Sequence, residues 1–240
     1  MGHEFELPLE AEVGATPEEV WAAISTGPGI DSWFLGRTEV AGGVVRTAFG
    51  GGEMPPSRVT AAEEPRRFAH ASATGDDGRF VAYEFLVEGR DRGSTLVRMV
   101  TSGFLPGDDW AEEYEAMTGG AALFFATLVE YLTHFPGRRA TPVTEFGPPV
   151  TDWPRAWQTL YAEVGDAAPG GKVRLDLPGL PPIDGVVYHR GDQTLGIRAG
   201  NALYRFMQGF RGPMIASHHL FGDPADQGPA WRAWLDRLHG

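Results

Sequence analysis

The sequence predicts an α+β fold in which an antiparallel sheet is wrapped around one long C-terminal helix, followed by a smaller α+β domain. Apolar residues recur every three or four positions from Asp108 to Phe135, which is the spacing of a single helical face. Six strand-like segments precede this stretch, and turns rich in glycine, proline and aspartate separate them. Because the connections between them are short, successive strands are expected to pair antiparallel.

The long helix is predicted to cross a whole small domain. At 1.5 Å per residue it is roughly 40 Å long, and Pro136-Gly137 ends it. Asp109 and Glu112 are a plausible capping pair at its start. Its apolar face consists of Trp110, Tyr114, Met117, Ala121, Phe124, Phe125, Leu128, Leu132 and Phe135.

Gly119 and Gly120 interrupt this helix, and each costs about 1 kcal/mol relative to alanine in a helix interior. Two explanations stay open at this point. A strand could approach the helix closely or the helix could kink there, or the missing side chains could leave room for a ligand.

The first 136 residues follow one order of elements. Residues 5–13 alternate apolar and acidic side chains, which predicts a half-buried strand with an acidic outer face. Thr16, Pro17 and Glu19 form a capping box with proline at the first helical position, so a short helix follows. A second short helix is expected from Ile30 to Leu35. The six strands are expected at about residues 38–41, 44–49, 57–62, 67–74, 80–88 and 94–102.

The rest of the chain is predicted to form a second unit. Residues 137–150 contain several prolines and glycines and are interpreted as a linker, with a short strand over 143–146 as an option. Residues 151–240 are expected to form the small α+β domain. Its helices are expected at 152–164 and 229–238, and its strands at 172–177, 185–189, 194–198, 202–208 and 213–220.

Composition excludes several classes of partner. The chain has a formal net charge of −12 and no cysteine, which suits a cytoplasmic protein without disulfides. Residues 1–136 hold 22 acids and 9 bases, a net of −13, so nucleic acid is not an expected partner. The N-terminus shows no signal peptide, and the longest wholly apolar run, Ala121 to Ala126, is too short for a membrane span.

Motifs for phosphate binding, nucleophilic catalysis or metal binding are not found. Gly50-Gly51-Gly52 lacks the following lysine of a phosphate loop and is interpreted as a hairpin turn. His218 and His219 would point to opposite faces of a strand and could not bind one metal together. We therefore expect no cofactor, no metal and no catalytic cluster.

Four stretches of residues 1–136 resemble a known superfamily. They are residues 15–21, residues 30–34, the strand that ends at residues 100–104, and the helical stretch 110–132 with its internal glycines. In these the chain is similar to the START-like, or SRPBCC, helix-grip superfamily, and most to its AHSA-like branch of heat-shock ATPase activator homologues. The superfamily includes lipid carriers, hormone receptors, polyketide cyclases and co-chaperone domains, so the resemblance implies a fold and not an activity.

The resemblance implies a partly hollow interior between the sheet and the long helix. The residues expected to line it are Trp33, Phe34, His70, Phe85, Met99, Trp110, Met117, Gly120, Ala121 and Phe124. His70 and Ser72 share a strand face and are the polar candidates. Glu84 and Arg98 lie on neighbouring strands and are expected to form a surface pair.

The favoured hypothesis is a binding protein rather than an enzyme. It would hold a small hydrophobic or amphipathic molecule, with the second unit serving as a cap or as the contact of a homodimer. Residues 151–240 would be a reduced helix-grip unit or an α+β cap. Two alternatives stay open: an enzyme resembling polyketide cyclases or aromatases, using His70, Ser72, Glu84 or Arg98, and a co-chaperone-like interaction module with an acidic surface.

Overall fold

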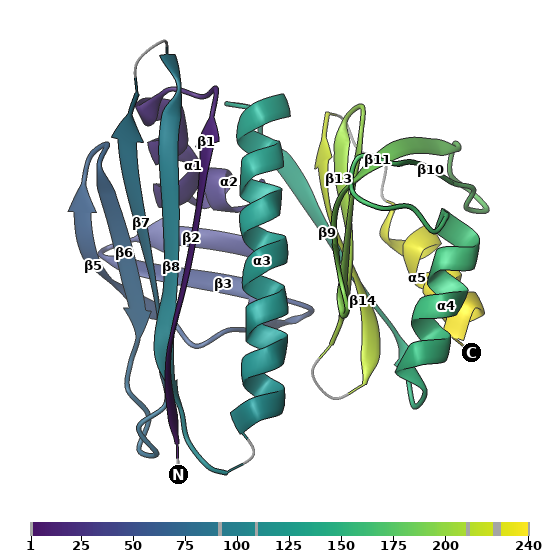
Figure 1. Ribbon diagram of the computed structural model, residues 1–240, viewed down its shortest axis with the longest axis horizontal. Coiled ribbons are helices and arrows are strands. Elements are labelled where there is room, and N and C mark those ends of the chain that lie inside the picture. Colours follow the sequence, from purple (N-terminus) through teal and green to yellow (C-terminus); the bar gives the residue numbers. More distant parts are fainter. Residues whose placement is uncertain (1, 91–92, 109, 210–211, 223–226, 240) are drawn as a thin grey trace. The chain divides into compact units, whose positions relative to one another are not determined.

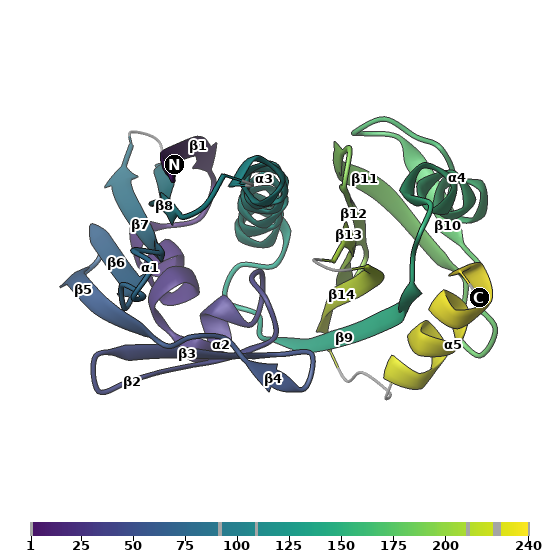
Figure 2. The same ribbon diagram turned by 90° about the horizontal axis from the view of Figure 1, so that it is seen from below.

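The computed structural model describes residues 2–90, 93–108, 110–209, 212–222 and 227–239. The chain divides into two compact units, Met1–Arg139 and Ala140–Gly240, which are shown in Figures 1 and 2. Each unit has its own antiparallel sheet and its own helices, so each is described by itself.

The first unit is a curved sheet closed by helices. Its elements are β1 (His3–Val13), α1 (Pro17–Ser25), α2 (Gly27–Ile30), β2 (Arg37–Ala41), β3 (Val44–Phe49), β4 (Gly52–Glu53), β5 (Ser57–Glu63), β6 (Arg67–Ser72), β7 (Phe80–Gly89), β8 (Thr95–Leu105) and α3 (Trp110–His134). The strand order is β1-β8-β7-β6-β5-β3-β2, with β4 paired to β3. Figure 2 shows β1 and β2 on opposite arms of the sheet, with α1 and α2 between the arms and α3 beside β1. The fold class is the predicted one, a helix-grip arrangement of α+β type.

The capping box predicted for α1 is confirmed. Thr16 Oγ1 accepts a hydrogen bond from the backbone N–H of Glu19 at 3.2 Å, and Glu19 Oε2 accepts one from the N–H of Thr16 at 2.8 Å. The helix that follows buries Val20, Ala23 and Ile24 against the concave face of the sheet.

The second short helix differs from its prediction. A helix was expected from Ile30 to Leu35, but α2 spans Gly27–Ile30. The reason is that Thr26 caps it, its hydroxyl accepting from the N–H of Gly29 at 3.1 Å, and Pro28 fits the first turn of a helix.

The long helix α3 is only partly buried. It packs mainly on β1 and β8, and the capping residue expected at Asp109 lies outside the described residues. Within the described residues it is the one helix whose length and composition would also allow a membrane span. The core helix of a folded domain passes the same test. Its buried residues are Ala121, Leu123, Phe125, Thr127, Leu128, Tyr131 and Leu132.

The second unit is a six-stranded sheet with two helices on one face. Its elements are β9 (Ala140–Pro149), α4 (Trp153–Val164), β10 (Lys172–Leu175), β11 (Ile183–Gly191), β12 (Thr194–Ala199), β13 (Ala202–Gln208), β14 (Pro213–Phe221) and α5 (Gly228–His239). The strand order is β10-β11-β12-β13-β14-β9. Figure 1 shows α4 and α5 on the same side of this sheet, where Leu160, Phe206 and Trp231 belong to its buried core.

The expected linker is wrong over residues 140–149, which form the edge strand β9. This strand pairs with β14 from Phe221 opposite Ala140 to Pro213 opposite Pro149. The prolines that suggested a linker are compatible with an edge strand, because one side of such a strand needs no N–H donors.

Candidate functional site

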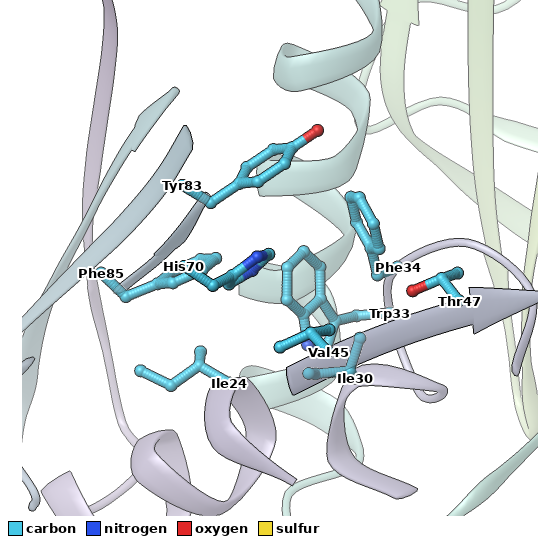
Figure 3. Close-up of a pocket in the computed structure, with 9 residues that line it drawn as sticks. All are labelled: Ile24, Ile30, Trp33, Phe34, Val45, Thr47, His70, Tyr83 and Phe85. Atoms are coloured by element: carbon cyan, nitrogen blue, oxygen red, sulfur yellow. The ribbon is translucent and has the colours of Figure 1, made fainter. Parts of the chain in front are cut away.

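The first unit contains a small cavity between its sheet and its short helices. Figure 3 shows the side chains around it. They come from α1, α2, the turn after α2, and strands β3, β6 and β7: Ile24, Ile30, Trp33, Phe34, Val45, Thr47, His70, Tyr83 and Phe85. The space open to the centres of water molecules is about 20 Å³, which is room for about one water. We call this space the chamber.

Aromatic rings in fixed contact form most of the chamber wall. Trp33 is buried, and its Nε1 donates to the backbone oxygen of Ala23 at 3.0 Å, which fixes the ring. The Trp33 ring meets Phe85 edge-on at 5.8 Å and Phe34 at 5.3 Å between centroids. Phe34 is only half-buried and meets Phe124 of α3 at 5.0 Å. Phe34 is thus a partly exposed wall residue, as are His70 and Tyr83.

His70 is the polar centre of the chamber. Its ring stacks on that of Tyr83 from the neighbouring strand, with centroids 5.2 Å apart, and Figure 3 shows the two side by side. Its Nδ1 is buried and has no hydrogen-bond partner among the described residues. Burial lowers the pKa of His70 to about 4, so the ring is neutral at pH 7.

Two hydroxyl groups accompany His70. Burial raises the pKa of Tyr83 to about 12, so this side chain also stays neutral. Thr47 Oγ1 lies 3.2 Å from Thr38 Oγ1, which gives it one hydrogen bond on β2. The chamber thus combines apolar walls with neutral groups that can each donate or accept a proton in a hydrogen bond.

Four of the ten predicted lining residues lie around the chamber: Trp33, Phe34, His70 and Phe85. Met99 is buried on β8 directly opposite Phe85, and Phe124 touches Phe34. The other four lie elsewhere on α3. Trp110 stacks on His3 at 3.9 Å, Met117 and Gly120 are half-buried, and Ala121 is buried.

The chamber does not lie where a cavity was expected, between the sheet and the long helix. The two short helices and the Trp33-Phe34 segment occupy the concave face of the sheet, so they line the chamber and α3 does not. Five lining residues were missed: Ile24, Ile30, Val45, Thr47 and Tyr83. Tyr83 could have been found from the sequence, because Val81, Tyr83 and Phe85 occupy alternate positions and therefore share one face of a strand.

Two other polar candidates have structural roles. Ser72 Oγ accepts from the backbone N–H of Val81 at 3.1 Å. Glu84 pairs with Arg67 at 2.7 Å and not with Arg98, which lies opposite Leu86. Proton transfer by Glu84 and Arg98 acting together is therefore not supported by their placement.

The two glycines of α3 have space around them. A Cβ on Gly119 would meet no atom within 4 Å, and one on Gly120 would meet only Phe124 Cε2 at 3.6 Å. Close approach of a strand, one half of the first explanation for this pair, is therefore excluded. In the second unit, His218 and His219 are both buried, and no group of three metal-ligating side chains occurs within the described residues.

Comparison with known proteins yields fold-level likenesses. No protein-family model matches the chain, and no curated protein matches it. Among solved structures, the Aha1 dimer from Colwellia psychrerythraea is 20% identical, with 53% of this chain and 96% of that chain covered and a TM-score of 0.44.

Two matches extend over most of the chain. DynU16, from the dynemicin biosynthetic locus, is 18% identical over 97% of this chain and 96% of that chain, with a TM-score of 0.45. The di-domain ARO/CYC protein BexL from the BE-7585A biosynthetic pathway is 14% identical over 91% of this chain and 85% of that chain, with a TM-score of 0.46. Likenesses at this level assign no activity to this chain, and the AHSA-like branch stays a prediction.

Proposed function

We propose that the first unit binds a small, mostly aromatic molecule that carries a hydrogen-bonding group, with its rings among Trp33, Phe34 and Phe85 and its polar group on His70. The observation that carries this proposal is the buried Nδ1 of His70, which has no partner among the described residues and borders an aromatic chamber. A buried polar atom without a partner destabilises the fold, whereas a ligand that bonds to it would remove that cost.

Binding requires the chamber to enlarge, because about 20 Å³ holds no organic molecule. Phe34 is the residue best placed to move. It is half-buried, it follows the short helix α2, and its ring meets those of Tyr83 at 5.8 Å and Phe124 at 5.0 Å between centroids. Rotation of this ring would open the chamber and leave the backbone hydrogen bonds of the sheet in place.

The test compares two probes that differ by one hydroxyl, biphenyl and para-hydroxybiphenyl, by equilibrium dialysis. One hydrogen bond to His70 contributes on the order of 1 kcal/mol, so the hydroxylated probe should bind about fivefold more tightly. In His70→Leu this preference should vanish or reverse, because the hydroxyl would then be buried without a partner.

The matched control is His189→Leu in the second unit. His189 Nε2 already lies 2.9 Å from Thr194 Oγ1, so its loss should leave the preference unchanged. Equal affinity for the two probes in the unmodified protein, or an unchanged preference in His70→Leu, contradicts the proposal.

An enzyme resembling polyketide cyclases is a second candidate, and the His70–Tyr83 pair favours it. A neutral imidazole in a nearly dry, aromatic site can remove a proton from a bound carbonyl compound, and a neutral tyrosine beside it can donate to the oxygen. His70→Gln separates the two candidates: it should retain binding of para-hydroxybiphenyl, since glutamine can still form a hydrogen bond, but it should abolish any turnover that needs a base.

A further inference from the structure

Three polar side chains form a row across the inner face of the first sheet. His70 on β6 lies directly opposite Tyr83 on β7, and Tyr83 lies directly opposite Thr101 on β8. Residues directly opposite in antiparallel strands project from the same face of the sheet. The three side chains are therefore neighbours on the face that lines the chamber, and we call them the polar row.

The polar row is set in an apolar wall. Two residues along the strands, the next row on this face is Phe68, Phe85 and Met99. On the other side, Val81 lies opposite Gly103, which in turn lies opposite Phe5. Polar groups at one level of an otherwise apolar surface are typical of sites where a ligand is oriented.

Thr101 occupies the far end of this row, and no hydrogen bond among the described residues uses its hydroxyl group. It is 2% exposed, and its Oγ1 has no hydrogen-bond partner among the described residues. Valine has the same shape and no polar atom, so it would fit the position without an unpaired hydroxyl. Both ends of the polar row, His70 Nδ1 and Thr101 Oγ1, thus have unused hydrogen-bonding capacity.

We propose that Thr101 is a second polar anchor of the ligand site, and that the ligand is an elongated, mostly aromatic molecule with a hydrogen-bonding group at each end. β6 and β8 are separated by two strand spacings, about 10 Å, which sets the length of the molecule. This inference rests on the proposed function, because it extends the same site from His70 past Tyr83.

Space for such a molecule can arise beside α3. Phe34 touches both Tyr83 and Phe124, so the Phe34 ring lies beside Tyr83, the middle member of the polar row. Phe124 has room to move, because the Gly120 position meets only its Cε2 atom and the Gly119 position meets nothing within 4 Å. The glycine pair thus leaves open space next to the Phe124 ring, into which this ring can move.

The test adds a third probe, para,para′-dihydroxybiphenyl, which carries one hydroxyl at each end of two linked rings. In the unmodified protein it should bind about fivefold more tightly than para-hydroxybiphenyl, the gain of one hydrogen bond. Thr101→Val should remove this second gain and leave the first, which depends on His70. Thr101→Ser, which keeps the hydroxyl, should retain it.

The melting temperature of Thr101→Val gives an independent result. It should be equal to or higher than that of the unmodified protein, because no hydrogen bond is lost. A lower melting temperature would mean that the hydroxyl is bonded in the free protein, and this overturns the proposal, as does an unchanged preference for the two-hydroxyl probe in Thr101→Val. Failure of His70→Leu to change binding of para-hydroxybiphenyl would instead overturn the proposed function, so the two failures are distinguishable.

Discussion

The two units bury polar side chains in opposite ways. In the first unit, His70 and Thr101 have unpartnered polar atoms on a face that borders a chamber. In the second unit, Arg205, Ser217 and His218 are fully buried, and they bond to one another. Arg205 donates through Nε to the Ser217 carbonyl at 3.0 Å, through Nη2 to Ser217 Oγ at 2.9 Å, and through its backbone N–H to His218 Nδ1 at 3.1 Å.

The difference separates a structural network from a candidate binding site. His218 Nε2 has no hydrogen-bond partner among the described residues, but its ring is packed against Trp231 at 4.1 Å and against Tyr204 and Phe206. Since Nδ1 accepts a hydrogen bond, the proton of the neutral ring is on Nε2, where it meets aromatic rings and no free space. Burial and the nearby Arg205 charge hold the pKa of His218 well below its usual value. A buried polar atom without a partner is therefore a candidate ligand contact only where it also borders a cavity.

The largest loss of stability is expected in the tightly packed core of the second unit. Trp231 is fully buried against Tyr204, Phe206, His218 and Trp234. Trp231→Ala should lower the free energy of unfolding of this unit by about 4 kcal/mol, through lost contacts and the cavity left behind. Hydrogen exchange of the β13 and β14 amides measures this loss of stability. Half-buried Trp153 provides the control, because Trp153→Ala should lower the free energy of unfolding clearly less. Equal costs would mean that His218 is not held by tight packing.

A pH titration should show the cost of burying His70 in the first unit. Its pKa falls from 6.5 to about 4 on folding. Above pH 6.5 the ring is neutral in both states. Between pH 6.5 and 4 only the unfolded chain takes up the proton, so stability falls as the pH falls, by on the order of 3 kcal/mol in total.

Hydrogen exchange of the β6 and β7 amides across this range measures the loss in the first unit separately from that caused by His218. His70→Leu should flatten the profile of these strands between pH 6.5 and 4. A profile that His70→Leu leaves unchanged would mean that this ring is protonated equally in both states.

Deleting one buried hydroxyl from each unit should have opposite effects. Ser217→Ala removes one acceptor of Arg205 Nη2 and should cost about 2 kcal/mol, because a charged donor loses a buried hydrogen bond. Thr101→Val removes an unpartnered hydroxyl and should be neutral or stabilising by up to about 1 kcal/mol. Urea unfolding of both variants, followed by hydrogen exchange, shows whether each substitution lowers or raises the free energy of unfolding. If both substitutions change it in the same direction, the two units do not differ in how they bury hydroxyl groups.

The smallest effect is expected at the glycine pair. Gly119→Ala should raise the free energy of unfolding by about 1 kcal/mol, since the helix gains propensity and the new methyl group meets no atom. Gly103→Ala on β8 is the opposite case, because its Cβ would run into the carbonyl oxygen of Phe80 and should destabilise the unit. If Gly119→Ala also destabilises, the space beside α3 is filled and the extension of the site toward Thr101 has no room.

Most of the fold could be predicted because it follows from local patterns. The strand β13 was predicted at its observed bounds, Ala202–Gln208, and the helical spacing predicted α3 to within two residues at its start. β9 was misinterpreted because its prolines mark a turn in most contexts, and only the pairing with β14 shows that they lie on an edge strand.

The site was only partly predictable, because it depends on register and on which elements fill the concave face. The aromatic residues near it and His70 could be found from the strand pattern. The order His70–Tyr83–Thr101 could not, since it is set by how β6, β7 and β8 align, and a one-residue shift would reverse every side chain. That α1 and α2 line the chamber in place of α3 is a matter of tertiary packing.

The most direct test is the ¹⁵N NMR signal of the His70 imidazole in protein labelled at its histidines. We expect Nδ1 of His70 to shift on addition of para-hydroxybiphenyl and to stay in place with biphenyl, while His189, already bonded to Thr194, does not respond to either probe. If His70 does not respond, or if biphenyl moves it as far as the hydroxylated probe does, then the spare hydrogen-bonding capacity in the first unit is not a binding site.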